Sequence, residues 1–343
     1  MPMESLLCCS IYSSSPLSST NSPVFDLHPS RSMGDGSLHI VMLPWLAVGH
    51  LLPFMELSKR MAQHGHRVSL LVTKRNIQRL PRVPPHLSSL LRFVELPMPS
   101  IEHLPENAEA SIDLPSDELR PYLRQAFDTF QHRLSSFLRQ TLPRVPDWVV
   151  FDYAAYWAPR VAAEFGVPCA YLSVFSAASL SFFGPPAVLM GCEGVRATPE
   201  QFMERPEWVP FESTIFYKPY EARELFNPGF LPDASGVSES YRFGRTLEDC
   251  QLIAVRSSPE FEPDWLHLLG KLHKRPVPRN EEDGSFTAEG IATTLRLVMV
   301  EEQGRPLRAK AKEYREVFGD EKLNDGHVWE FLEYLTEHRR QQA

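Results

Sequence analysis

The sequence predicts an α/β protein built on a doubly wound, parallel sheet. Six short and mostly apolar runs lie between residues 38 and 257, as is typical of strands buried on both faces of a parallel sheet. Helical patterns alternate with them, and the chain has 343 residues, 43% of them hydrophobic, enough for a sizeable core. The predicted strands are Leu38–Leu43, Arg67–Thr73, Leu91–Leu96, Trp148–Phe151, Cys169–Phe175 and Leu252–Val255.

Three helices are predicted between these strands. Leu51–His64 carries an apolar stripe and stops at Gly65, a residue suited to a helix C-terminus. Pro121–Thr141 repeats its apolar residues at helical spacing, and Ala154–Phe165 stops at a glycine followed by a proline. Residues 193–248 mix prolines with aromatic residues, which predicts a long excursion with short helices that forms a pocket wall.

The last part of the chain has a different pattern. Residues 271–280 are basic and interrupted by prolines, and three amphipathic helices are predicted beyond them. Their apolar stripes are Ile291, Leu295, Val298 and Met299, then Leu307, Ala311, Tyr314 and Phe318, then Val328, Phe331, Leu332 and Leu335. Asn324 or Asp325 is the expected N-cap of the third helix. No predicted strand after Val255 offers these helices a surface to cover.

Composition excludes several classes of protein. The net charge of −8, with scattered basic residues, argues against nucleic-acid binding. Five cysteines without metal-like spacing predict neither a disulfide framework nor a metal site, and favour a reducing, cytoplasmic setting. Residues 1–36 are rich in serine and proline and predict a disordered leader. The most apolar window, Val174–Met190, contains serines and a proline pair, so it predicts a buried helix and loop and no membrane span.

Two candidate catalytic residues follow predicted strands. His50 lies in the turn after the first strand, where an alternative is a histidine that only starts the next helix. Asp152 ends the fourth strand, where an alternative is a helix N-cap. Both would lie at the carboxyl edge of a doubly wound sheet, where ligands bind. A carboxylate bonded to one imidazole nitrogen raises the basicity of the other, so the pair predicts a general base for a hydroxyl group.

Other enzymes of this fold class need motifs that the sequence lacks. The turn after the first strand, residues 47–52, has one glycine, so it departs from the Gly-x-Gly-x-x-Gly of nicotinamide dehydrogenases. There is no P-loop. Ser257 and Ser258 follow the sixth strand, but no Gly-x-Ser-x-Gly elbow is present, which disfavours hydrolase chemistry.

The motifs around these residues resemble a known family. Gly49-His50-x-x-Pro53-Phe54, His64-Gly65-His66-Arg67-Val68-Ser69, Val149-Val150-Phe151-Asp152 and Phe165-Gly166-Val167-Pro168 are similar to the N-terminal half of plant family 1 UDP-glycosyltransferases. That family has the GT-B fold of two Rossmann-like domains. The resemblance covers residues 37–275 and 277–340. It is closest to the branch of glycosyl- and rhamnosyltransferases that act on flavonoid or triterpenoid glycosides.

The resemblance implies an inverting transfer without a metal or a bound cofactor. His50 would deprotonate the acceptor hydroxyl, Asp152 would hold that histidine, and a UDP-sugar would be the co-substrate. The acceptor would be a small apolar molecule such as a flavonoid or terpenoid glycoside. The expected acceptor-binding residues are Trp45, Gly49, Tyr153, Tyr156 and Phe175, with ordinary core packing as the alternative for each aromatic one.

The chain departs from the family in its second half. The Trp-x-Pro-Gln run and the His-Cys-Gly-Trp-Asn-Ser motif that hold the nucleotide are not in the sequence. We therefore expect a leader (1–36), an acceptor-binding domain (37–265), a linker with a deletion junction (266–285) and remnant helices of the donor domain (286–343), which pack loosely and cross back to the first domain. The resemblance then implies little or no transfer by this chain, and UDP-sugar binding only if the donor site is restored. The alternative is a non-catalytic protein that binds a small molecule or a partner.

Overall fold

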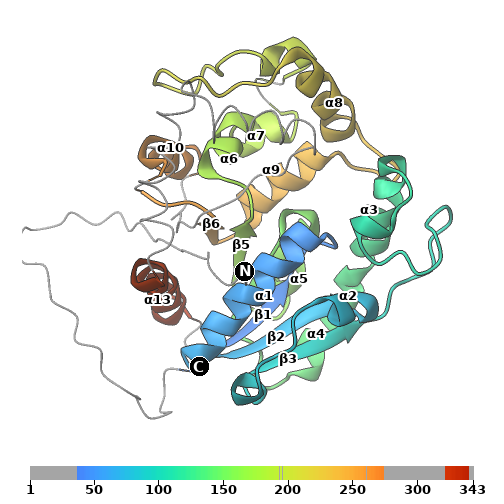
Figure 1. The fold of residues 1–343 in the computed structure, drawn as a ribbon, viewed down its shortest axis with the longest axis vertical. Helices are drawn as coiled ribbons and strands as arrows, with labels where there is room; N and C mark the ends of the chain where they lie inside the picture. Colours follow the sequence, from blue (N-terminus) through green and yellow to red (C-terminus); the bar gives the residue numbers. More distant parts are fainter. Residues whose placement is uncertain (1–36, 193, 195, 260, 274–320, 340–343) are drawn as a thin grey trace, which may run out of the picture.

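The strands form one parallel sheet. The computed structural model describes residues 37–192, 194, 196–259, 261–273 and 321–339. In this part of the chain the strand order is β3-β2-β1-β4-β5-β6 (Figure 1). All six predicted strands are confirmed, the first and fifth being slightly shorter than expected. They are β1 (His39–Leu43), β2 (Arg67–Thr73), β3 (Leu91–Leu96), β4 (Trp148–Phe151), β5 (Cys169–Ser173) and β6 (Leu252–Val255).

The strand order reverses between β1 and β4. From β1 the chain proceeds through β2 to β3 on one side, then returns to place β4 on the other side of β1. In a doubly wound sheet, this reversal leaves a crevice at the carboxyl ends of the two central strands. Leu43 at the end of β1 is in register with Phe151 at the end of β4. The residues that follow these two strands are therefore neighbours.

The three helices predicted in the first half are present, with two differences, and the structure adds shorter helices that were not predicted. The predicted 121–141 helix is divided at Thr129, and the 154–165 helix begins as a separate 3₁₀ turn. Gly65, which follows the first helix, has a φ of 87°, as expected for a glycine stop. The elements are α1 (Val48–Gln63), α2 (Lys74–Arg79), η1 (Pro85–Leu87), η2 (Ser111–Asp113), η3 (Asp117–Leu119), α3 (Arg120–Asp128), α4 (Phe130–Gln140), η4 (Tyr153–Ala155) and α5 (Ala158–Ala163).

The excursion between β5 and β6 contains short helices, as predicted. The apolar window 174–190 forms two of them, and no helix in the described ranges is long and apolar enough to cross a membrane. The elements are α6 (Ala177–Phe183), α7 (Pro186–Leu189), η5 (Pro199–Phe202), α8 (Pro219–Phe230) and α9 (Glu239–Asp249), followed after β6 by α10 (Pro263–His273).

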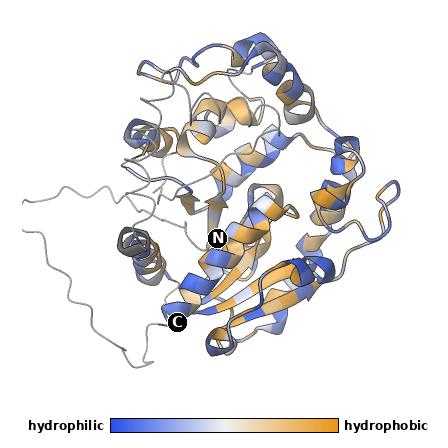
Figure 2. Cartoon of the chain, in the orientation of Figure 1, coloured by the Kyte–Doolittle hydropathy of each residue, from blue (hydrophilic) through white to orange (hydrophobic). Residues whose placement is uncertain are grey.

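A separate apolar core covers each face of the sheet. One core joins alternate strand residues such as Val41 and Phe151 to α3, α4, α5, α9 and α10. The other joins Met42 and Val150 to α1. Apolar colour is accordingly concentrated in the strands and on the helix sides that face them (Figure 2). The continuous apolar runs in the sequence exist because each strand is covered on both sides.

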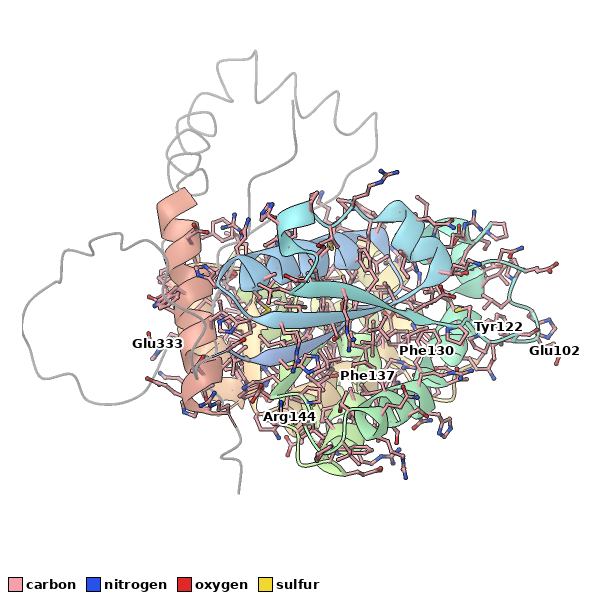
Figure 3. The ribbon with its side chains drawn as sticks, turned by 90° about the horizontal axis from the view of Figure 1, so that it is seen from below. Glu102, Tyr122, Phe130, Phe137, Arg144 and Glu333 are labelled. Carbon is pink, nitrogen blue, oxygen red and sulfur yellow. The ribbon has the colours of Figure 1, made fainter. Side chains whose placement is uncertain are left out.

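The last helix, α13 (Glu321–Glu337), packs on the same core as α1, so the prediction of loose packing is wrong for it. Its stripe residues, Val328, Phe331, Leu332 and Leu335, are all at most 2% exposed. The indole nitrogen of Trp148 donates a 2.8 Å hydrogen bond to the Leu335 carbonyl. Figure 3 shows α13 along one side of the sheet, with Glu333 pointing outward. The α13 stripe therefore covers strands of the first domain, as the expected crossing back requires.

The predicted N-cap of this helix is also wrong, because Asn324 and Asp325 lie inside α13. Asp325 instead forms an ion pair with Arg60 on α1. The predicted leader, residues 274–285 of the predicted linker and the two helices predicted within 286–320 lie outside the described residues, and the first part of that linker, 266–273, belongs to α10.

Candidate active site

His50 and Asp152 meet at the point where the strand order reverses. His50 is in the first turn of α1, directly after β1, and Asp152 follows β4. The Asp152 amide donates to the Leu43 carbonyl at 3.1 Å, which continues the β1–β4 pairing past the strand ends. The imidazole Nδ1 of His50 lies 2.8 Å from the Asp152 carboxylate. The predicted juxtaposition of these two side chains is present in the structure.

The two oxygens of Asp152 have different partners. Oδ1 accepts from the Tyr153 amide at 2.8 Å, which is the N-cap arrangement weighed as an alternative. Oδ2 accepts from His50 and, at 3.2 Å, from the Trp45 amide. One side chain therefore caps the η4 turn and also orients the histidine.

This arrangement favours one tautomer of a neutral imidazole. A carboxylate only accepts hydrogen bonds, so a neutral His50 ring that faces one carries its proton on Nδ1, which leaves the Nε2 lone pair available. The Asp152 side chain is 1% exposed and the His50 side chain 14%. A buried carboxylate behind a partly accessible imidazole is the geometry of a general base held by an acid.

Aromatic rings surround the His50 imidazole. The ring centroids of Tyr153 and Phe175 lie 5.9 Å and 5.7 Å from that of His50. Phe243 of α9 stacks on Tyr153 at 4.2 Å and 5° and contacts Phe175 edge-on at 5.6 Å. Phe243 was not singled out from the sequence, although it lies in the segment predicted to form a pocket wall.

The other expected acceptor-binding residues are arranged differently. Trp45 contributes its amide to Asp152, but its ring is 3% exposed and packs edge-on against Phe127, as in the core-packing alternative. Tyr156 lies against the Arg242 guanidinium, 4.9 Å from the ring centroid. Gly49 is exposed, and a β-carbon there would meet no atom within 4 Å. Of these three, Gly49 has the open surroundings that a ligand needs.

A polar group borders the aromatic wall that Tyr153, Phe175 and Phe243 form. The Tyr153 hydroxyl donates to Glu239 at 3.4 Å, and Glu239 is also paired with the buried Arg124. Burial, and after it the Glu239 carboxylate, raises the pKa of Tyr153, so the phenol stays protonated and remains a donor. No local pattern predicts this group, because its members are far apart in the chain.

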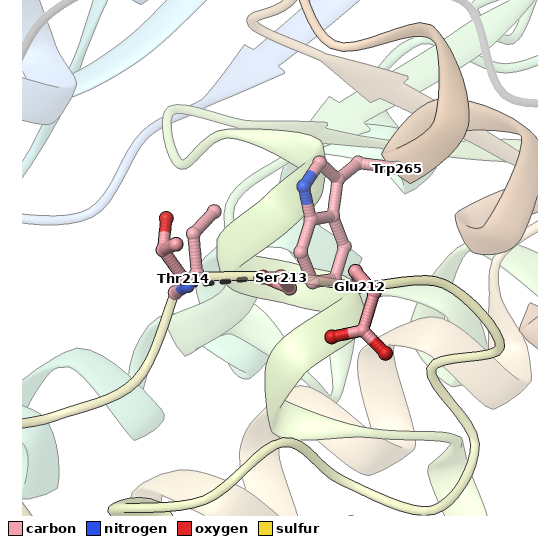
Figure 4. A pocket seen from close by; sticks show the side chains of 5 residues that line it. Glu212, Ser213, Thr214 and Trp265 are labelled. Atoms are coloured by element: carbon pink, nitrogen blue, oxygen red, sulfur yellow. Dashed lines mark hydrogen bonds between the residues drawn. The ribbon is translucent and has the colours of Figure 1, made fainter.

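A separate pocket lies on the excursion. It has a volume of about 340 Å³ and is lined by residues 212–215 and by Trp265 of α10 (Figure 4). Within its loop, the Ile215 amide donates to the Ser213 hydroxyl at 3.0 Å. None of the residues that surround His50 lines this pocket. Among the described residues no cluster of three potential metal ligands occurs, and Cys169 and Cys250 are buried.

The fold and the site define a doubly wound α/β domain with a histidine–carboxylate pair at its strand reversal. Comparison with known proteins identifies the family. The chain is 45% identical to UDP-glycosyltransferase 91C1 of Arabidopsis thaliana over 240 residues, 70% of this chain and 51% of the relative. It is 37% identical to soyasaponin III rhamnosyltransferase of Glycine max, over 71% of this chain and 50% of the relative. No family model matches the chain.

This chain covers a larger share of the length of a third relative. The protein named inactive UDP-glycosyltransferase 79A6 of Glycine max is 30% identical over 72% of this chain and 75% of its own length. The chain belongs to the plant UDP-glycosyltransferase family, as its motifs predicted. It spans about half the length of the first two relatives.

Solved structures agree on the fold. A variant of Os79 from O. sativa, in complex with UDP, has a TM-score of 0.51 at 21% identity, covering 69% of this chain and 51% of the other. The described domain therefore has the fold of one half of the GT-B architecture.

Proposed function

We propose that this chain provides the acceptor side of a sugar transfer. In the complete reaction, a sugar moves with inversion from a UDP-sugar to a hydroxyl of a small apolar acceptor, a flavonoid or terpenoid glycoside. His50 is the general base and Asp152 holds it. The observation that carries the proposal is the 2.8 Å bond between these side chains at the strand reversal. Membership of the UDP-glycosyltransferase family supports it.

The chemistry follows from the arrangement of the pair. The free lone pair on Nε2 of His50 takes the acceptor hydroxyl proton, while Asp152 stabilises the imidazolium that forms. The acceptor oxygen then forms a bond to the anomeric carbon of the sugar. The bond from that carbon to the diphosphate breaks on the opposite side, and UDP leaves with the electron pair. A positioned base of this kind contributes a rate factor of about 10²–10⁴.

The surroundings of His50 support an apolar acceptor. Phe175 is half-buried and offers an apolar ring beside His50, the kind of contact that aromatic or fused-ring molecules need. Tyr153 is 5% exposed and stacks on Phe243, as in the core-packing alternative, so it supports the aromatic wall from behind. One relative is named for its action on a soyasaponin, which supports a terpenoid glycoside. The five cysteines of the sequence, an odd number without metal-like spacing, support a reducing, cytoplasmic setting.

We further propose that these 343 residues alone bind an acceptor but do not turn over a sugar. Stabilising the departing diphosphate is a large part of such catalysis, and the family's nucleotide-binding motifs are not in the sequence. UDP-sugar would act as a partner only where a donor site is supplied. The absence of these nucleotide-binding motifs from the sequence also favours the second candidate function, a non-catalytic protein that binds a small molecule or a partner.

Two measurements on the purified chain test these proposals. Calorimetric titration with quercetin, used as a probe, should show binding that weakens in His50→Ala. Titration with UDP should show none. Incubation with quercetin and UDP-glucose or UDP-rhamnose, followed by mass spectrometry, should give no product above a protein-free blank. Robust product would overturn the proposed inactivity, and an absence of quercetin binding would count against the acceptor site.

A further inference from the structure

Two buried arginines lie behind the aromatic wall of the site. Arg242 on α9 is 0% exposed and Arg124 on α3 is 3% exposed. The two terminal nitrogens of Arg242 bind the two carboxylate oxygens of Asp128 at 2.7 Å and 2.6 Å. Arg124 is paired with Asp233 at 2.6 Å and with Glu239. These three ion pairs join α3 to α9 and to the loop before α9, more than 100 residues away in the chain.

Arg242 also binds the backbone of the turn that follows Asp152. Its Nη1 donates to the Ala154 carbonyl at 3.1 Å. One turn further along α9, the Thr246 hydroxyl donates to the Tyr153 carbonyl at 3.1 Å. Two consecutive carbonyls of η4 are therefore held by side chains from the same face of α9.

The η4 turn in turn holds Asp152. Its first residue, Tyr153, donates its amide to Oδ1 of Asp152, while Oδ2 faces His50. The Tyr153 ring is fixed by stacking on Phe243, the neighbour of Arg242 on α9. A displacement of the turn would therefore shift the amide that holds Oδ1 of Asp152.

Stability alone is a weak reason for a fully buried arginine. Removing an ion pair from water is costly, and well-packed apolar residues in place of the whole pair often stabilise a core equally well. An apolar residue in place of Arg242 could not, however, donate a hydrogen bond to the Ala154 carbonyl. The planar guanidinium of Arg242 can do so while Asp128 holds it in place. The contribution of Arg242 is therefore to fix the position of the Ala154 carbonyl.

We propose that Arg242, locked by Asp128, is a positioning residue for the His50–Asp152 pair and acts through the Ala154 carbonyl. This inference rests on the proposed function of that pair. It goes further because it assigns the orientation of the base to an ion pair between α3 and α9.

Imidazole NMR on the full chain tests this inference. In the wild-type protein His50 should carry its proton on Nδ1, with a low-field resonance from the bond to Asp152. Arg242→Met should lose that resonance and give a mixture of the two tautomers. Arg242→Lys should retain part of the signal, since an ammonium group can still reach Asp128. Leu87→Ala, a core change on the other face of the sheet, should lower the unfolding midpoint and leave the signal unchanged.

A folded Arg242→Met protein with the wild-type Nδ1 resonance would overturn the inference. If that variant does not fold, Asp128→Asn removes the charge pair at nearly constant volume. A wild-type resonance in Asp128→Asn would overturn the inference equally. The measurement uses neither UDP-sugar nor acceptor. A negative NMR result would therefore leave the proposed function standing. Conversely, failure of the chain to bind quercetin would not affect the interpretation of the NMR result.

Discussion

Replacing Phe331 by alanine tests how firmly α13 is docked on the sheet. The Phe331 ring is 0% exposed and belongs to the core shared with α1. Deleting a fully buried ring removes its transfer free energy and leaves a cavity, at a cost of about 3–5 kcal/mol. If the helix detaches, the indole N–H of Trp148 also loses its buried partner, which adds about 1–3 kcal/mol. Either loss is a large share of the roughly 5–15 kcal/mol that stabilises a domain.

Urea unfolding followed by tryptophan fluorescence measures this loss. The matched control is Glu333→Ala, which changes an exposed residue of the same helix (Figure 3). That change should stay within about 0.5 kcal/mol of the wild type. Amide exchange across residues 321–339 should be slow in the wild-type protein and fast in Phe331→Ala. Equal midpoints for the two variants, or fast exchange in the wild type, would show that α13 does not contribute to the core.

Two further predictions concern buried histidines and a glycine. Burial lowers the pKa of His39 and of His66 from 6.5 to about 4. Between these values the unfolded chain binds more protons, so the free energy of unfolding should fall by about 1.4 kcal/mol per pH unit for each histidine as the pH drops from 6.5 towards 4. In urea titrations from pH 7 to pH 4.5, His39→Gln should show a shallower dependence, and an unchanged slope would contradict the assignment. Gly184 has a φ of 114°, and a β-carbon there would lie 2.6 Å from the Trp208 ring. Gly184→Ala should therefore cost more than the roughly 1–3 kcal/mol of backbone strain alone. Gly236→Ala, at a φ of 88° with no atom within 4 Å, should show only the strain, and equal losses would refute the predicted contact.

The strands and the juxtaposition of His50 and Asp152 could be predicted because their signals are local. A strand buried on both faces needs a continuous apolar run, and each such run is visible in a few residues. His50 and Asp152 each follow one of these runs, so the parallel topology alone brings them to the same edge. The interior position of Asp325 in α13 shows the limit of local rules, since a good capping residue was used for an ion pair instead.

The contacts that could not be predicted are distant in the sequence. The α13 stripe was recognised, but nothing in its residues identifies the sheet it covers. The Trp148 bond to Leu335 joins positions far apart in the chain. Arg242 likewise meets its partner Asp128 only after the sheet has formed. Amphipathic patterns predict that a face is buried, and tertiary packing decides what buries it.

The absorption spectrum of bound quercetin tests the role of His50 most directly. A base that takes the proton of a phenolic hydroxyl should give a phenolate band at longer wavelength, at a pH where free quercetin remains protonated. His50→Gln should abolish this band while retaining binding through the aromatic wall. Asp152→Asn should reduce it, because an amide cannot stabilise an imidazolium. A wild-type band in His50→Gln, or no band in a wild-type protein that binds quercetin, would contradict His50 as the base.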